Sequence, residues 1–278
     1  MRIKRYFVYS FFVLFSLSFY SCDNGINIFS TADDASLGSQ LNAQVEGDSK
    51  EYPIYHGNPA IKNYIVDRIF NHILASSQIQ YKNVFSYKLE IIDNDNTLNA
   101  FCLPGGYIYV YTGLLKYLNS EAALAGVVAH EIAHAERRHS TKRMTAQYGV
   151  AILVNIILGN NPSELEQIAA NLLVGIGFLA NSRSDENEAD QYSFNFLKDT
   201  RYYQGGVKFF FEKMRADGLI SSQSNKIATF LSTHPDPISR IDETNKRLNG
   251  AGIPIKDYTA TGEGIYTTEY MTNIRNRF

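Results

Sequence analysis

The stretch GVVAHEIAHAERRHS, residues 126–140, decides what this chain can be. It predicts part of a helix that begins near Ser120. His130 and His134 are four residues apart, which puts them about 40° apart around a helix and one turn apart along it, so both rings can face one point. Neutral imidazole is a good zinc ligand. The pattern therefore indicates a metal site, although helical histidines can also make ordinary hydrogen bonds.

Two further residues of this stretch are placed by the same helical geometry. Glu131 lies about 100° from His130, where it can reach a water beside the ion without binding the ion, as the general base of an H-E-x-x-H helix does. His139 lies about 180° from His130, so we expect it to face away and do not assign it as a ligand. A longer zinc motif is excluded, because it needs Gly and His where this chain has arginine and serine.

A third ligand is expected, because a catalytic zinc has three protein ligands and one open position. The acidic segment SRSDENEAD, residues 182–190, offers one. On a helix Glu186 and Asp190 share a face, so Glu186 can bind the metal while Asp190 accepts a hydrogen bond from the back of an imidazole. Glu188 is about 200° from Glu186 and is expected to point elsewhere. The plainer alternative is a solvated acidic helix start.

The rest of the chain predicts many helices around a small sheet, which is an α+β fold. Alternating apolar residues predict a strand at 85–93, and a segment rich in Tyr, Ile and Val predicts a second strand at 107–113. Periodic apolar residues predict a helix at 58–77. A polar helix is predicted at 181–200, another helix that ends at a glycine at 205–218, and a turn followed by a last helix at 232–250. Two very apolar segments, 149–159 and 168–180, are too short to span a bilayer. We expect them to be core helices, with a lid or a contact with membrane as alternatives.

Four parts follow one another along the chain. Residues 1–21 start basic, continue apolar and end in a small residue, which predicts a signal peptide. Cys22 then predicts a lipidation site of the lipoprotein type. Phe19 and Tyr20 depart from the commonest lipoprotein signal, which leaves plain secretion or an uncleaved anchor open. We assign 22–56 to a tether and lead-in, 57–250 to the globular domain and 251–278 to a C-terminal tail.

Composition excludes some partners. The 278 residues carry a net charge of −2 and no basic patch, so we expect no nucleic acid and no nucleotide as a partner. Hydrophobic residues make up 45% of the chain, enough for a sizeable core. Cys102 has no disulfide partner if Cys22 is acylated, and we expect it to be a small buried apolar residue.

Four segments together resemble the M48 family of zinc metallopeptidases. They follow the family's order and cover roughly residues 57 to 250: NAFCLPGGYIYVYTGLL (99–115), VVAHEIAHAERRHS (127–140), SRSDENEAD (182–190) and STHPDPISRI (232–241). The resemblance implies a mostly helical zincin-type metallopeptidase domain with a small β-sheet beside the H-E-x-x-H helix. Within the family, the chain is most similar to exported members that are soluble or lipid-anchored.

The resemblance also implies roles for individual residues. It implies one bound Zn²⁺ per chain, held by three ligands: His130, His134 and Glu186. It implies that Glu131 is the catalytic base and that Asp190 orients a ligand. It places His234 near the active site, where it stabilises the transition state or occupies the open metal position in a resting form. Arg240 could stabilise developing negative charge, but we expect it to pair with an acid on the surface.

The expected function is that of a zinc-dependent metalloendopeptidase acting on polypeptides. The resemblance implies misfolded or unassembled cell-envelope proteins as substrates, and a place on the periplasmic face of a bacterial membrane, most simply the outer one, through the lipid on Cys22. The alternative is a lipid-anchored chaperone or assembly factor that uses the same cleft with little turnover, against which the intact Glu131 argues. We also expect an extended substrate to pair with strand 107–111, with Gly105, Gly106 and Tyr107 close to its backbone.

Overall fold

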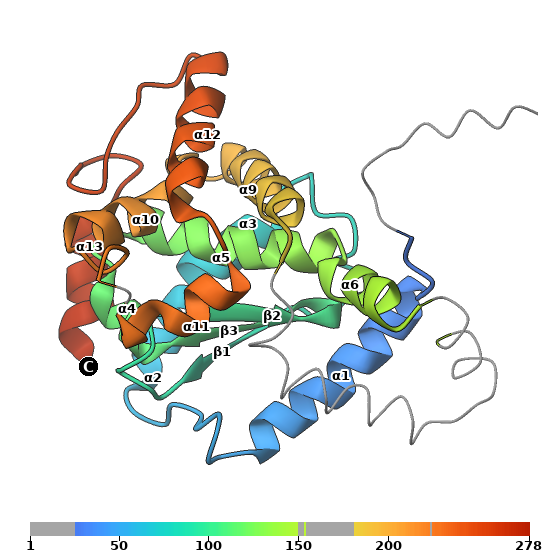
Figure 1. Ribbon diagram of the computed structural model, residues 1–278. Coiled ribbons are helices and arrows are strands. Elements are labelled where there is room, and N and C mark those ends of the chain that lie inside the picture. Colours follow the sequence, from blue (N-terminus) through green and yellow to red (C-terminus); the bar gives the residue numbers. More distant parts are fainter. Residues whose placement is uncertain (1–25, 150–152, 154–180, 223) are drawn as a thin grey trace, which may run out of the picture.

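A three-stranded sheet lies at the centre of the molecule (Figure 1). The computed structural model describes residues 26–149, 153, 181–222 and 224–278. The strands are β1 (Lys88–Ile92), β2 (Ala100–Leu103) and β3 (Tyr107–Tyr111), in the order β1-β3-β2. β1 runs parallel to β3, with Leu89 opposite Ile108, whereas β2 runs antiparallel to β3, with Cys102 opposite Ile108. The expected α+β fold with a small sheet beside the histidine helix is confirmed.

Each face of the sheet carries its own core, because successive side chains of a strand point to opposite faces. On one face aliphatic residues such as Leu89, Ile108 and Val110 join the main core. On the other face an aromatic set, including Phe101 and Tyr109 stacked 4.9 Å apart between ring centroids, packs with Leu37 of α1 (Thr31–Gly47). In Figure 1, α1 and α5 lie on opposite sides of the sheet.

The histidine helix is α5 (Glu121–Glu136), and every residue in it is buried. Ser120 caps its start by accepting a hydrogen bond from the backbone of Ala123 at 3.2 Å. α5 packs between the sheet, α9 (Arg183–Lys198) and α10 (Val207–Ala216). Gly126 permits this closeness, because a Cβ there would lie 2.1 Å from the backbone nitrogen of Val207. A helix with no exposed residue can present histidines to an interior site.

α5 ends before His139, contrary to the prediction that one helix carries all three histidines. Arg138 adopts a left-handed conformation, with φ 58°, and a new helix α6 (His139–Tyr148) starts after it. The two helices therefore run in different directions (Figure 1). An angle counted along one continuous helix does not apply to His139.

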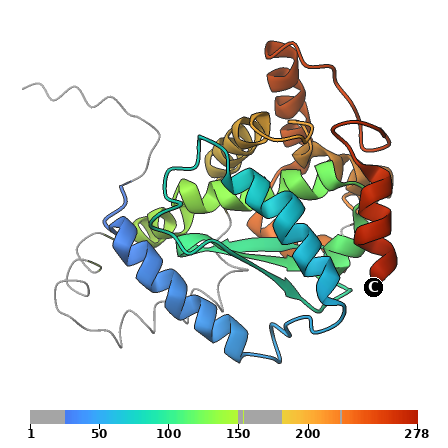
Figure 2. The same cartoon turned by 180° about the vertical axis from the view of Figure 1, so that it is seen from behind.

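The helix predicted over 58–77 is present as three consecutive pieces, best seen from behind in Figure 2. These are α2 (Pro59–Ile65), the π-helical turn η1 (Val66–Phe70) and α3 (Asn71–Leu74). Asn58 caps the first piece, as its position before a proline predicts. The apolar stripe is fully buried in the main core: Ile61, Ile65, Ile69 and Ile73.

Short helices complete the described part of the chain. They are the 3-10 turn η2 (Pro104–Gly106), α4 (Thr112–Tyr117), α11 (Asn225–Thr233), α12 (Pro237–Gly250), α13 (Thr267–Asn273) and the 3-10 turn η3 (Arg275–Arg277). Helices are present within both segments that flank the predicted globular domain, the lead-in at 22–56 and the C-terminal tail at 251–278. Within 22–56, α1 covers a face of the sheet, and within 251–278, Ile265, Tyr270 and Ile274 are fully buried in the main core.

Three expectations concern residues outside the described ranges. They are the signal peptide at 1–21, the lipidation site at Cys22 and most of the apolar segments 149–159 and 168–180. None of the helices in the described part of the chain combines the length and the apolar character needed to cross a bilayer.

Candidate metal centre

Four buried side chains from three elements converge at one point. They are His130 and His134 of α5, Glu186 of α9 and His234, which directly follows α11. Each offers one ligand atom, and these atoms all lie within 4.8 Å of one another. No more than 3% of any of these residues is exposed. The structure thus brings together the three predicted ligands and adds His234 to them.

The spacing of the ligand atoms suits a small tetrahedral ion. The Nε2 atoms of His130 and His134 are 2.9 Å apart, and they lie 3.4 Å and 3.3 Å from the Glu186 carboxylate. His234 Nδ1 lies 3.1 Å from the same carboxylate. Ligand atoms bound at about 2.0–2.1 Å to a tetrahedral zinc are about 3.3 Å from each other. Three imidazoles and one carboxylate are a donor set that zinc accepts.

Behind His130 lies a carboxylate–arginine pair. His130 Nδ1 donates a hydrogen bond to Asp190 across 2.9 Å, as the shared face of Glu186 and Asp190 predicts. Arg240 of α12 binds Asp190 through two nitrogens, at 2.8 and 2.7 Å, and approaches Glu186 at 2.5 Å. Arg240 is 4% exposed, so the expected pairing with an acid on the surface is wrong. The cation compensates two buried carboxylates at once.

These neighbours set the charges of the site. Burial raises the pKa of Glu186, but the positive charges of His234 and Arg240 outweigh it and hold that pKa well below its usual value. In the same way Arg240 lowers the pKa of Asp190 to about 2 against the effect of burial. Burial and Arg240 lower the pKa of His130, yet Glu186 and Asp190 outweigh them and raise it to about 9. His130 therefore has to release a proton when it binds a metal.

Behind His134 lies a second histidine. His139 Nδ1 is 2.7 Å from His134 Nδ1, and His139 Nε2 is 2.9 Å from the Glu188 carboxylate. The expectation that His139 faces away is wrong, because the left-handed Arg138 turns the chain back toward the site. Glu188 does point away from Glu186, but it reaches His139 there. Burial lowers the pKa of both His134 and His139, so both rings are neutral near pH 7.

Glu131 lies beside the cluster without joining it. Its carboxylate is 3.6 Å from His234 Nε2, whose other ring nitrogen faces Glu186. Glu131 is 1% exposed. This arrangement leaves Glu131 next to the cluster rather than in it, which is the place expected of a general base.

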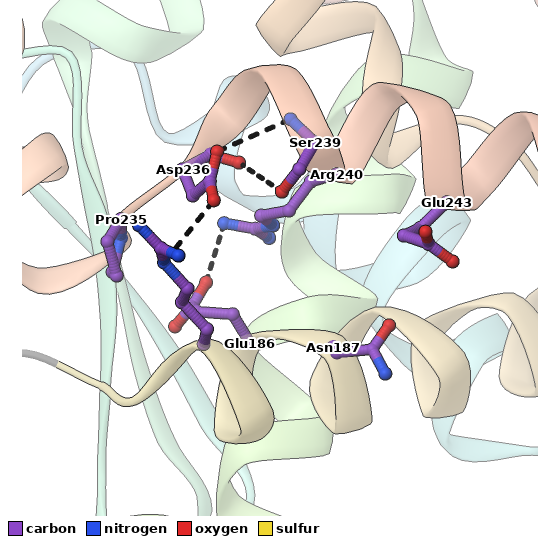
Figure 3. Close-up of a pocket in the computed structure, with 8 residues that line it drawn as sticks. Glu186, Asn187, Pro235, Asp236, Ser239, Arg240 and Glu243 are labelled. Carbon is purple, nitrogen blue, oxygen red and sulfur yellow. Dashed lines mark hydrogen bonds and ion pairs between the residues drawn. The ribbon is translucent and has the colours of Figure 1, made fainter.

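A small cavity opens beside the cluster, between the start of α9 and the start of α12 (Figure 3). Its volume is about 110 Å³. Glu186 and Arg240 form part of its wall, and their side chains point toward each other across it. The remaining wall is largely polar: Arg183, Asn187, Pro235, Asp236, Ser239 and Glu243. Glu186 therefore lies between the ligand cluster and this cavity.

The strand predicted to pair with a substrate, 107–111, does not lie at an edge of the sheet. Gly105 and Gly106 form the buried turn η2 against α1, and Tyr107 begins β3, the central strand of the sheet. A strand with partners on both sides has no edge for a substrate. β2 lies beside β3 at the edge of the sheet that contacts α5. None of the described strands pairs with the other side of β2.

Sequence reasoning missed three contacts of the site. The sequence favours a surface position for Arg240 and a direction for His139 that faces away from the other two histidines. The third is Asn181, whose side-chain nitrogen lies 3.4 Å from His134 Nε2 and from His234 Nδ1. The position of Asn181 just before the capped start of α9 carried no signal, because nothing in the local pattern relates it to a histidine 47 residues earlier.

Comparison with known proteins agrees with this geometry. The sequence profile described as Peptidase family M48 matches residues 60–248. This range covers all four converging ligands, Glu131, His139 and Arg240.

Three curated relatives are similar over most of this chain. The mitochondrial metalloendopeptidase OMA1 of Schizosaccharomyces pombe is 30% identical over 210 residues, covering 73% of this chain and 60% of that protein. The β-barrel assembly-enhancing protease of Escherichia coli K12 is 29% identical over 229 residues, covering 77% and 46%. A putative β-barrel assembly-enhancing protease of Vibrio cholerae is 27% identical, covering 68% and 40%. This chain thus spans 40 to 60% of the length of these relatives.

Proposed function

Because this chain belongs to peptidase family M48, we propose that it is a zinc-dependent endopeptidase with one Zn²⁺ per chain. The observation that carries the proposal is the convergence of His130, His134 and Glu186 with Glu131 beside them. These four occupy the positions that a metal-dependent hydrolase needs: three ligands and a base that is not a ligand.

The reaction divides between the ion and the chain. When bound, zinc supplies Lewis-acid chemistry, which activates water near neutral pH and polarises a carbonyl group. Glu131 accepts the proton of the attacking water and transfers it to the leaving amine. Asp190 and Arg240 hold His130 in place and keep Glu186 ionised. The burial of all these groups excludes bulk water and strengthens their interactions.

We assign His234 to the resting form of the site. Its Nδ1 atom lies among the ligand atoms, at 3.1 Å from Glu186 and 3.4 Å from His130 Nε2. In this position His234 would be a fourth residue that holds the ion in the resting form. Its other ring nitrogen, Nε2, lies 3.6 Å from the Glu131 carboxylate. A role in stabilising the transition state remains the alternative.

We place the substrate along β2 instead of β3. Tyr111 donates its backbone N–H to the Asn99 carbonyl at 3.1 Å. Phe101 and Leu103 follow Asn99 by two and four residues, so they also turn their backbone groups toward β3. The backbone groups of Ala100 and Cys102 then point to the outer side, where an extended peptide can add as a strand.

The substrate class and location are extensions of this proposal. We propose that the protein acts on misfolded or unassembled envelope proteins, at the periplasmic face of a bacterial membrane, where a lipid on Cys22 anchors it. The Escherichia coli and Vibrio cholerae relatives are named as β-barrel assembly-enhancing proteases, the latter putatively, which supports this choice. The signal-like layout of residues 1–22 supports export.

A single substitution tests the enzymatic proposal. Glu131→Gln should lower cleavage of an unfolded protein such as casein by about 100-fold or more, because the general base is lost. Zinc content should stay near one per chain, since Glu131 is not a ligand. His134→Ala should lose both zinc and cleavage, while Glu263→Gln, which changes an exposed carboxylate, should lose neither.

Aggregation and cellular assays of the same variants separate the endopeptidase from the chaperone alternative. If the wild-type protein binds zinc, suppresses aggregation of clients and shows the same cellular effect with Glu131→Gln, then the chaperone alternative is correct. If the wild-type protein binds no stoichiometric zinc, the endopeptidase proposal fails.

A further inference from the structure

We propose that His139 and Glu188 are positioning residues, which fix His134 in the tautomer and orientation that bind the metal, and that Asp34 of α1 holds them in place through Arg138. The inference rests on the proposed metal site. It gives a role to the contact between His134 and His139 and to the N-terminal helix α1. The reaction itself requires neither of them.

The proton positions follow from three contacts. Two ring nitrogens only 2.7 Å apart, His134 Nδ1 and His139 Nδ1, must share one proton. If His139 donated it, the single proton of neutral His134 would sit on Nε2 and block metal binding, and an unprotonated His139 Nε2 would face the Glu188 carboxylate. Only the opposite assignment satisfies every contact. His134 donates to His139 from Nδ1, and His139 donates to Glu188 from Nε2.

This chain of contacts leaves His134 Nε2 unprotonated, so its lone pair is available to a metal. That atom lies in the cluster, 2.9 Å from His130 Nε2 and 3.3 Å from Glu186. A carboxylate behind a ligating imidazole fixes its tautomer and makes it a stronger donor toward the ion. Here an intervening histidine carries that effect from Glu188. Glu188 has a side chain 27% exposed, so its charge remains partly hydrated at the far end.

The position of His139 depends on the left-handed Arg138. This conformation is unfavourable for a residue with a side chain, and it persists where surrounding contacts impose it. The Arg138 guanidinium binds the buried Asp34 carboxylate and the carbonyl of Phe29, both in or next to α1. Nearby, Asn27 donates to the Thr141 hydroxyl at 2.9 Å. The N-terminal segment thus clamps the turn that brings His139 back to His134.

Zinc affinity tests the proposal directly. Metal-free protein is titrated with Zn²⁺ in competition with a chelator, and the visible spectrum of the Co²⁺ form reports the geometry of the site. Glu188→Gln and His139→Asn should both weaken zinc binding and alter the Co²⁺ spectrum. The variant with the larger effect should weaken zinc binding by roughly ten- to a hundredfold. His72→Asn, which changes an exposed histidine on α3, should leave both unchanged.

A second pair of variants separates orientation from packing. His139→Asn keeps an acceptor close to the Nδ1 position, whereas His139→Leu fills the space better but accepts no hydrogen bond. Orientation predicts tighter zinc binding in the Asn variant, and packing predicts tighter binding in the Leu variant. If the His139 variants fail to fold, Glu188→Gln decides alone, because its side chain is partly exposed.

The outcomes distinguish this inference from the proposed function. Wild-type zinc affinity together with an unchanged Co²⁺ spectrum in Glu188→Gln and His139→Asn overturns the inference and leaves the endopeptidase intact. Failure of the wild-type protein itself to bind zinc overturns both.

Discussion

The two histidines of the metal helix are supported in different ways. On the α12 side of the cluster, His130 meets Asp190 directly, and Arg240 binds that carboxylate in turn. On the α6 side, His134 reaches Glu188 only through His139. The α12 side is assembled from side chains of intact helices, whereas the α6 side depends on a break between two helices. The difference teaches that the same result, an oriented imidazole, can rest on local spacing or on a distant contact.

The largest effect should come from breaking the α12 side. Arg240→Gln removes the cation between two buried carboxylates, Glu186 and Asp190, and should cost roughly 3–5 kcal/mol in the free energy of unfolding of the metal-free protein. Zinc should restore part of that loss, because the ion also neutralises Glu186. Urea denaturation with and without zinc measures both quantities.

An exposed arginine nearby provides the control for this variant. Arg183 has a side chain 83% exposed and pairs with Asp236 at 3.4 Å, so Arg183→Gln should change stability by no more than about 1 kcal/mol. Equal losses in the two arginine variants would mean that Arg240 does not compensate the buried carboxylates.

A smaller effect is expected from breaking the α6 side at its distant support. Asp34→Asn weakens the hold of α1 on Arg138 and should cost about 2 kcal/mol, because a buried charged hydrogen bond is lost. Zinc affinity should fall as well, since the turn before His139 loses its clamp. Glu46→Gln on the same helix breaks a more exposed pair with Lys88 and should leave zinc affinity unchanged. An intact affinity in Asp34→Asn would separate α1 from the metal site.

The smallest effect concerns the element that both sides share. α9 carries Asp190 for one side and Glu188 for the other, and its start is fixed by a capping box between Ser182 and Asp185. Ser182→Ala should cost about 1 kcal/mol and weaken zinc binding a few-fold, because Glu186 lies in the first turns. Asn58→Ala removes a side-chain cap from α2, which carries no residue of the metal site. It should cost a similar stability without the change in affinity, and a matching change would mean that α9 is not special.

Sequence patterns predicted the parts of the site that lie within continuous elements. His130, His134 and Glu131 follow from one helical spacing, and the shared face of Glu186 and Asp190 follows from another. The helix at 58–77 follows from apolar periodicity, helices are also predicted at 181–200 and 205–218, and the structure shows a helix in each range. In these cases each residue's surroundings are set mainly by its near neighbours in the sequence.

Other features depended on contacts that no local pattern reveals. The left-handed Arg138 is held by residues about a hundred positions earlier, so the direction of His139 could not be read from spacing. β2 forms within a stretch rich in turn residues, and its addition beside β3 removed the edge expected for a substrate. α1 has few apolar residues, but they meet an aromatic face of the sheet that becomes visible only in three dimensions.

The C-terminal segment has a consequence for how the chain acquires its structure. Tyr270 of α13 donates a hydrogen bond to the carbonyl of Leu115, 155 positions earlier, and the ring of Phe278 packs against that of Tyr55. The core therefore closes through pairs that are far apart along the chain, which slows folding because long loops must be ordered before these pairs form. During synthesis the chain cannot complete this core until Tyr270 and Ile274 have been made. Until then its apolar interior remains accessible to chaperones.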